Sequence, residues 1–314
     1  MQQLKQKMEQ ARELSWQTFG KQITFFLPGM FSCNGHSGKY PAVSITGPDC
    51  VLQCEHCKAK ILESMILARE PDQLLEKCLQ LEEKGNLGVL ISGGCDEDGC
   101  LPWGKFLSAI KEVKRRTNLR ISVHSGFVTE TMAFSLKEAG VDQVLVDVIG
   151  DDKTYRRVYH LESGVSKLVS SLRALRRAGL TIVPHICCGL DFGKIRGERN
   201  AIELISGFDI GLLVFISLMP IPGTPMGTTT TPRGDDVAEL IVEARLRMPA
   251  TQISLGCARE RGNGRLEILA IDAGINRMAL PSEEALNRAR YYGLEINYQR
   301  TCCSMGEAIP DEGW

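Results

Sequence analysis

Long apolar runs and an excess charge of one sign are both missing from this 314-residue chain. No stretch approaches the roughly 18 apolar residues that a membrane span requires. The opening segment MQQLKQKMEQARELSWQTF is typical of a polar amphipathic helix and lacks the apolar core of a signal peptide. The net charge is −1 and no basic run occurs, so no feature favours nucleic acid or an anionic membrane as a partner. We therefore expect a soluble, cytoplasmic protein that binds neither.

Cysteine, by contrast, is abundant. Twelve cysteines in a chain without a secretion signal argue against a disulfide framework and for metal binding or redox chemistry. Cys78 is the exception, because it shares a predicted helical face with Leu74 and Leu81 and is typical of a buried structural thiol. The other cysteines gather at a few points along the chain, which directs attention to those points.

From about residue 42, short apolar runs alternate with longer amphipathic segments. The runs predicted as strands are residues 42–47, 87–94, 120–126, 143–150, 181–189, 210–218, 251–257 and 275–282. Eight strand-then-helix units predict an α/β fold, a parallel (β/α)8 TIM-type barrel, and the span fits the roughly 250 residues of such barrels. An open doubly wound sheet is the alternative, since periodicity alone cannot show closure.

The predicted barrel implies a simple division of the chain. Residues 1–41 are expected to form an N-terminal helical extension packed on the barrel. Residues 42–314 are expected to hold the barrel and a short C-terminal tail with cysteines. Active sites of such barrels lie where strands end and the following loops begin. Chemically capable residues occur at these points, namely Cys50, Gly93, Gly94, Cys95, His124, Asp147, Cys187, Cys188, residues 220–226 and Cys257.

The clearest motif is the cysteine triplet Cys50, Cys54 and Cys57, spaced Cys-x3-Cys-x2-Cys. Three thiolates on one short loop can hold a metal or a cluster from one side, and three protein ligands leave one position open. An open position suits a reactive site better than a structural one. The alternatives are a zinc site completed from elsewhere and a redox pair formed by Cys54 and Cys57.

This spacing, directly after the first barrel strand, resembles the signature of the radical S-adenosylmethionine (SAM) superfamily. The resemblance implies that Cys50, Cys54 and Cys57 hold a 4Fe–4S cluster whose open iron chelates SAM. It further implies cleavage of SAM to a 5′-deoxyadenosyl radical, which abstracts hydrogen from a substrate C–H bond. A ferredoxin- or flavodoxin-type reductant is the implied electron donor.

The same resemblance assigns SAM contacts. His56, the aromatic residue before the last cysteine, would lie near the adenine. The glycine pair after the second strand would meet the methionyl amino group, and a plain tight turn is the alternative. Asp147 would contact the ribose, or else cap the helix at residues 151–159. Arg157 or Arg156 would meet the SAM carboxylate, or else remain a surface arginine. These implied cofactor-binding residues are His56, Ser92, Gly93, Gly94, Asp147 and Arg157.

Within the superfamily, the loop PIPGTPM, with Pro222, Gly223 and Thr224, looks like the SAM-binding loop of the biotin synthase-like branch. More narrowly, AVSITGPDCVLQCEHCKAKILESM and ISLGCARERG resemble the biotin synthase-related proteins of the two-component lipoyl synthase. That likeness implies sulfur insertion into a protein-bound octanoyl chain, with an octanoylated lipoyl carrier domain and a second radical SAM protein as partners. The alternatives are a biotin synthase-like enzyme that rearranges or methylates a small molecule without sulfur insertion, a non-catalytic iron–sulfur protein, and a zinc-stabilised barrel.

Sulfur insertion calls for a second iron–sulfur cluster, which needs about four ligands. The candidate ligands are Cys187, Cys257, Cys302 and Cys303, with Cys33, Cys95 and Cys188 as substitutes. The alternative is that these are free thiols without a cluster.

Overall fold

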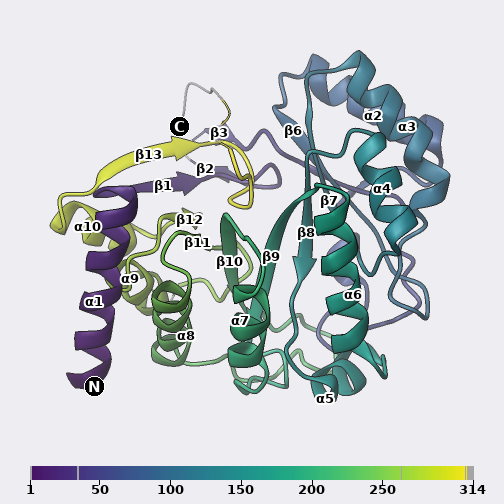
Figure 1. The fold of residues 1–314 in the computed structure, drawn as a ribbon. Helices are drawn as coiled ribbons and strands as arrows, with labels where there is room; N and C mark the ends of the chain where they lie inside the picture. The colour runs from purple at the N-terminus through teal and green to yellow at the C-terminus, as the bar shows by residue number, and fades with distance from the viewer. Residues whose placement is uncertain (1, 34, 263, 308, 310–314) are drawn as a thin grey trace.

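The structure is a computed structural model that describes the chain apart from residues 1, 34, 263, 308 and 310–314 (Figure 1). Its main feature is an eleven-stranded sheet in the order β13-β1-β12-β11-β10-β9-β8-β7-β6-β4-β5. The eight predicted strands are present as β4 (Ala42–Ser44), β6 (Gly88–Ser92), β7 (Arg120–His124), β8 (Gln143–Asp147), β9 (Thr181–Cys188), β10 (Leu212–Ser217), β11 (Gln252–Leu255) and β12 (Arg277–Ala279).

All pairings within this sheet are parallel, and the eight strands follow one another in chain order. A doubly wound sheet would reverse its strand order at a switch point. The predicted parallel β/α barrel is therefore confirmed and the doubly wound alternative is wrong. Among the described residues, the edge strands β5 (Ile66–Leu67) and β13 (Glu295–Gln299) do not pair with each other, so the barrel is open along this seam.

Helices cover the outer face of the curved sheet (Figure 1). They are α1 (Gln2–Phe19), α2 (Pro71–Glu83), α3 (Trp103–Arg116), α4 (Glu130–Glu138), α5 (Asp152–Thr154), α6 (Gly164–Arg177), α7 (Glu198–Ser206), α8 (Gly234–Arg247), α9 (Arg265–Asp272) and α10 (Glu283–Tyr291). A 3-10 turn (Lys60–Leu62) follows the cysteine triplet, and a π-helical turn (Tyr155–Tyr159) follows α5. No described helix is both long and apolar enough to cross a bilayer.

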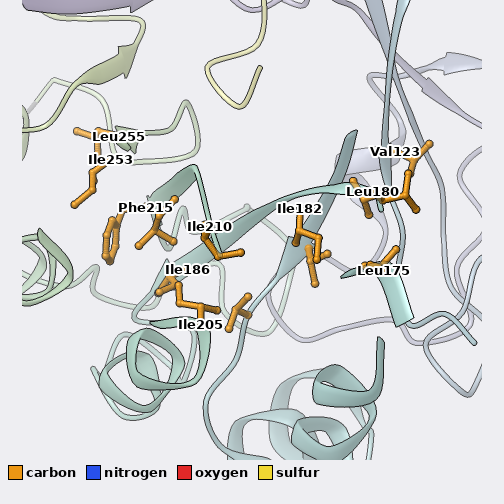
Figure 2. Close-up of a cluster of buried hydrophobic side chains, with 14 of the residues drawn as sticks. Val123, Leu175, Leu180, Ile182, Ile186, Ile205, Ile210, Phe215, Ile253 and Leu255 are labelled. Atoms are coloured by element: carbon orange, nitrogen blue, oxygen red, sulfur yellow. The ribbon is translucent and has the colours of Figure 1, made fainter. Parts of the chain in front are cut away.

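Alternation along the strands divides the apolar side chains between the two faces of the sheet. On β9, Ile182 and Ile186 join the main core beneath the helices, whereas Val183 belongs to a separate cluster with Val214 and Cys303. Figure 2 shows Ile186 beside Ile205 of α7, with Phe215 of β10 nearby. The strands thus present one face to the helices and the other to the barrel interior.

The first 41 residues differ from the predicted extension that merely packs on the barrel. The strand β1 (Gln22–Phe26) lies inside the sheet, paired with β12 on one side and β13 on the other. Only α1, which packs against α8 and α9, and the small hairpin of β2 (Ser32–Cys33) and β3 (His36–Ser37) lie outside it. A boundary at residue 41 therefore cuts across the sheet.

The C-terminal tail crosses the barrel at the starts of its strands. Gln143, the first residue of β8, donates from Nε2 to the Ser304 carbonyl at 2.9 Å and accepts from Gly306 N at 3.0 Å. Arg277, the first residue of β12, donates to the carbonyls of Met305 and Gly306. Gln143 and Arg277 are both buried, so the tail closes this end of the barrel.

Replacing Arg277 by alanine should destabilise the fold, because the buried carbonyl of Met305 and the partly buried carbonyl of Gly306 would lose their donor. We expect a loss of about 2–3 kcal/mol in the free energy of unfolding, measured by urea denaturation. The matched control is Arg290→Ala, whose exposed side chain pairs with Glu283 on the surface and should change the stability by less than about 0.5 kcal/mol. Equal losses of unfolding free energy in the two variants would contradict the conclusion that Arg277 stabilises the fold by holding the tail.

Candidate active site

A cavity of about 210 Å³ opens where β6, β7 and β8 end and where the cysteine loop, residues 50–65, begins. It brings together eight of the sixteen site residues that the sequence predicts. From the predicted set, its lining includes Cys50, Cys54, His56, Cys57, Ser92, Gly93, Gly94 and Asp147. It also includes Cys95, His124, Tyr155 and Tyr159.

The three thiols of the triplet differ in their surroundings. Cys54 and Cys57 are buried, whereas Cys50 is half-buried. A hydrogen bond from Cys54, aided by His56, lowers the pKa of Cys57 to about 4. The same hydrogen bond and burial raise the pKa of Cys54, and the charges of Cys50 and Cys95 raise it further. The pair therefore holds one thiolate at neutral pH, and the thiolate is the form that binds metals.

The glycine pair fixes the cysteine loop against the end of β6. A Cβ atom on Gly94 would stand 2.0 Å from the Asp49 carbonyl oxygen and 2.5 Å from the Cys50 Cα. Gly94 N also donates to Thr46 Oγ1 at 2.7 Å. Only glycine allows this approach of backbone to backbone, so Gly94 positions the first cysteine.

Glu55, between two cysteines of the triplet, ties the loop to its surroundings. Its carboxylate accepts from Lys58 Nζ at 2.9 Å and from His160 Nε2 at 3.1 Å. Its backbone N donates to the Val158 carbonyl at 2.9 Å, and its carbonyl accepts from Met226 N at 3.3 Å. The loop is thus bound to the π-helical turn and to the loop after β10.

The loop after β10 does not line the cavity but lies against the cysteine loop. Lys60 Nζ donates to the Pro222 carbonyl at 2.6 Å. Gly223 has a φ of +74°, and a Cβ there would stand 2.7 Å from Lys60 Nζ. Thr224 closes the turn by donating from its backbone N and from Oγ1 to the Ile221 carbonyl, at 3.2 and 2.8 Å. These contacts hold the loop after β10 against the cysteine loop.

Asp147 and Arg157, both predicted SAM contacts, have different positions. Asp147 lines the cavity and is not a helix cap, since Asp151 accepts from Thr154 N at the start of α5. Arg157 does not line the cavity, because its guanidinium pairs with the buried carboxylate of Asp191. Arg196 binds the second oxygen of Asp191 at 2.5 Å.

Three of the four candidate ligands of a second cluster lie together. Cys303 shares an interior cluster with Cys257, and a hydrogen bond from Cys303, aided by Ser304, lowers the pKa of Cys302 to about 6. Cys302 and burial raise the pKa of Cys303. Burial, followed by the charge of Cys302, raises the pKa of Cys257 to about 11. These contacts form a second thiol group at the end of β11, which we call the tail thiol group (Cys257, Cys302 and Cys303).

The remaining cysteines lie elsewhere. Cys187 packs among the side chains around Cys54 and Cys57, and Asp147 and Glu198 are its charged neighbours. Cys188 joins the core beneath the helices. Cys33 lies on the outer β2–β3 hairpin. The structure therefore separates Cys187 from the tail thiol group.

The donor set of the cavity fits an iron–sulfur cluster, because the three thiols of the triplet line one cavity and thiolates are the usual ligands of such clusters. His56 Nδ1 is buried beside the triplet without a hydrogen-bond partner among the described residues, so the cavity also offers a polar contact to a ligand.

Sequence reasoning missed several residues of this site. Cys95 was only a substitute ligand for a second cluster, yet it lines the cavity of the triplet. Tyr155 and Tyr159 form part of the wall, and their rings lie 5.7 Å apart. The run YRRVY contained the signal, because aromatic residues on a turn after the fourth strand face the barrel mouth. The roles of Glu55 and Thr46 depend on contacts that no motif shows.

Comparisons with known proteins agree with this geometry. The family model described as the radical SAM superfamily matches residues 44–193, and that of the biotin and thiamin synthesis associated domain matches residues 215–314. The structure of a methylornithine synthase superposes with a TM-score of 0.65 at 17% identity, covering 95% of this chain and 90% of that one. The hydrogenase maturase HydG gives 0.67 at 16% identity, covering 93% and 68%. Residues 44–193 thus match the radical SAM domain, and the chain is similar to radical SAM enzymes in fold.

Curated relatives refine this class. A biotin synthase of Rickettsia felis is 26% identical over 246 residues, covering 74% of this chain and 76% of its own. A biotin synthase of Thermus thermophilus is 27% identical over 280 residues, covering 81% and 80%. Together with the two consecutive family matches, these relatives support a likeness to the biotin synthase-like branch of the superfamily. The radical SAM family implies a 4Fe–4S cluster, SAM and an electron-donating reductant, and the lining of the cavity fits the first two.

Replacing Glu55 by glutamine should weaken cluster binding, because the loop would lose its pairing with His160 and Lys58. We expect about a tenfold loss in iron affinity, as for other residues that orient metal ligands. The iron affinity is measured as the iron that the reconstituted protein retains in the presence of a competing chelator. Glu63→Gln, on the exposed end of the same loop, is the control and should behave as the native chain does. If both variants retained iron equally, Glu55 would have no positioning role.

Proposed function

We propose that this radical SAM enzyme inserts sulfur at unactivated C–H carbons of a protein-bound octanoyl chain, as one of two components of a lipoyl synthase-type system. The observation that carries the proposal is the tail thiol group inside the barrel. An enzyme that only rearranges or methylates its substrate has no need of a second group of paired thiols. Sulfur insertion needs such a group as the ligands of a sulfur-donating cluster.

The two cofactors would supply a 5′-deoxyadenosyl radical and a sulfur atom, and the chain provides two thiol groups to hold them. Asp147, which lines the cavity, is paired in register with His185 of β9. His185 pairs with Val214 of β10, which pairs with Ser254 of β11. Ser254 lies near Cys303 and lowers the pKa of its thiol. This row of the sheet therefore leads from the SAM cavity to the tail thiol group.

The interior between the two groups suits an alkyl chain. The side chains clustered with Cys303 are apolar, namely Phe26, Val183, Leu212, Val214, Ala279 and Ile216. Burial and the neighbouring His124 hold the pKa of His185 near 4, so the imidazole stays neutral in this row. A neutral, apolar wall favours a hydrocarbon over a charged substrate.

A macromolecular carrier for the chain is supported by the mouth of the site. Val51 and Ile61 of the cysteine loop and Met219 of the loop after β10 are 64%, 45% and 44% exposed. Exposed apolar side chains around an active-site opening are typical of a protein-docking surface. The proposed partners are an octanoylated lipoyl carrier domain, a second radical SAM protein, and a ferredoxin- or flavodoxin-type reductant.

The curated relatives support a second candidate. Their shared name, biotin synthase, points to a related sulfur insertion into a small molecule. Both candidates use the same two thiol groups and differ only in whether the substrate is carried by a protein. Incubation with octanoylated carrier domain, the partner protein, SAM and reductant distinguishes them. Cleavage of SAM without sulfur added to the octanoyl chain would exclude the lipoyl-type reaction.

Replacing Cys54 by alanine should abolish SAM cleavage while leaving the tail thiol group intact. We expect iron to fall from about eight to about four per chain after anaerobic reconstitution, with no 5′-deoxyadenosine formed after reduction. Cys78→Ala is the control, because this thiol lies in the core beneath α2 and away from the cavity. A Cys54→Ala protein that still cleaved SAM would overturn the assignment of the triplet.

Replacing Cys303 by alanine should have the complementary effect. Iron should fall to about four per chain, SAM cleavage should persist, and product sulfur should disappear, as followed by mass spectrometry of the substrate. Cys188→Ala, a buried thiol on the helix side of β9, should change none of these quantities. Unchanged iron in the Cys303→Ala protein would remove the proposed sulfur donor.

A further inference from the structure

Cys95 is a fourth thiol in the cavity of the triplet, held close to the first. Its carbonyl accepts from Val51 N at 2.8 Å, so its backbone is bonded to the residue that follows Cys50. Gly94, just before it, packs on the Cys50 Cα without room for a side chain. Cys95 therefore moves with the cysteine loop as one unit.

The four thiols surround one space. Cys50, Cys54, Cys57 and Cys95 all line the same cavity. Cys100, on the same loop as Cys95, does not line it and instead forms a backbone bridge with Gly126.

We propose that Cys95 is the fourth ligand of the radical cluster when SAM is absent, bound to the iron that the triplet leaves open. This inference rests on the proposed radical function of the triplet. A cluster of four irons takes four ligands, and Cys95 is the further thiol that lines the cavity. A thiol gives up its proton on binding iron, because the metal stabilises the thiolate.

Binding of SAM would reverse this step. The bond between iron and Cys95 Sγ would break, the amino and carboxylate groups of SAM would take its place on the iron, and the thiolate would take up the proton that the SAM ammonium group loses on binding. No electron is transferred, so no oxidant or reductant is required. Cys95 thus protects the open iron between turnovers, and SAM displaces it on binding.

The test follows loss of the fourth iron. Native protein, Cys95→Ala and the control Cys100→Ala are reconstituted anaerobically and treated with limiting ferricyanide. The three-iron cluster that remains is quantified by EPR, and the released iron by a chelator. Cys54→Ala protein is treated in the same way, and the iron that it releases comes from the second cluster. This amount is subtracted from the iron released by each of the other proteins.

Without SAM, Cys95→Ala should form the three-iron cluster several-fold faster than the native chain and Cys100→Ala. With SAM bound, all three should react at the same rate. Equal rates without SAM would overturn the inference while leaving the radical function standing. If Cys95→Ala did not take up the radical cluster, Cys95→Ser, which keeps the size of the side chain, would replace it under the same criteria. Native protein that held no cluster at Cys54 would overturn the proposed function itself.

Discussion

The contact of Gly94 with Cys50 is the constraint on which the site depends. It joins the loop after β6 to the cysteine loop with no side chain between them. The cysteine loop is otherwise irregular, with positive φ at Gln53, Lys58 and Ala59. Such conformations cost free energy and persist only where the surroundings fix them. Here the surroundings are Gly94 on one side and the bonds of Glu55 on the other, so residues that are not ligands set the positions of the thiols.

The order of the barrel could be predicted because each of its eight strands is a local apolar run between amphipathic helices. The pairing of the strands at the edges of the sheet could not be predicted. β1 pairs with β13, and residues 22–26 and 295–299 are separated by nearly the whole chain. No local pattern reveals a pairing of that kind, since its free energy comes from contacts that form only after the barrel has assembled. The tail was likewise predicted only as an appendage, although Arg277 and Gln143 hold it within the barrel.

Position at a strand end predicted which residues reach the site but not on which side of the barrel they lie. Cys50 and Gly94 follow β4 and β6, Asp147 ends β8, and all three converge on one cavity. Cys187 and Cys257 also follow strand ends, but they belong to β9 and to the loop after β11, with β10 between them. Arg157 lies on the π-helical turn and pairs with a buried carboxylate on the next loop. A motif gives the spacing of residues along the chain, whereas the direction of a side chain on an irregular turn depends on its tertiary partners.

The two thiol groups share one physical arrangement although they lie on different sides of the barrel. In each, a hydrogen bond between two near neighbours in sequence lowers one pKa, to about 4 for Cys57 and about 6 for Cys302. Burial alone would raise both pKa values and keep the thiols protonated. The pairing therefore offsets burial and prepares a ligand in the thiolate form within an apolar barrel. The proposed reaction needs such an arrangement, because its substrate would lie between two clusters, and the strands that carry the neutral His185 lie between the two pairs.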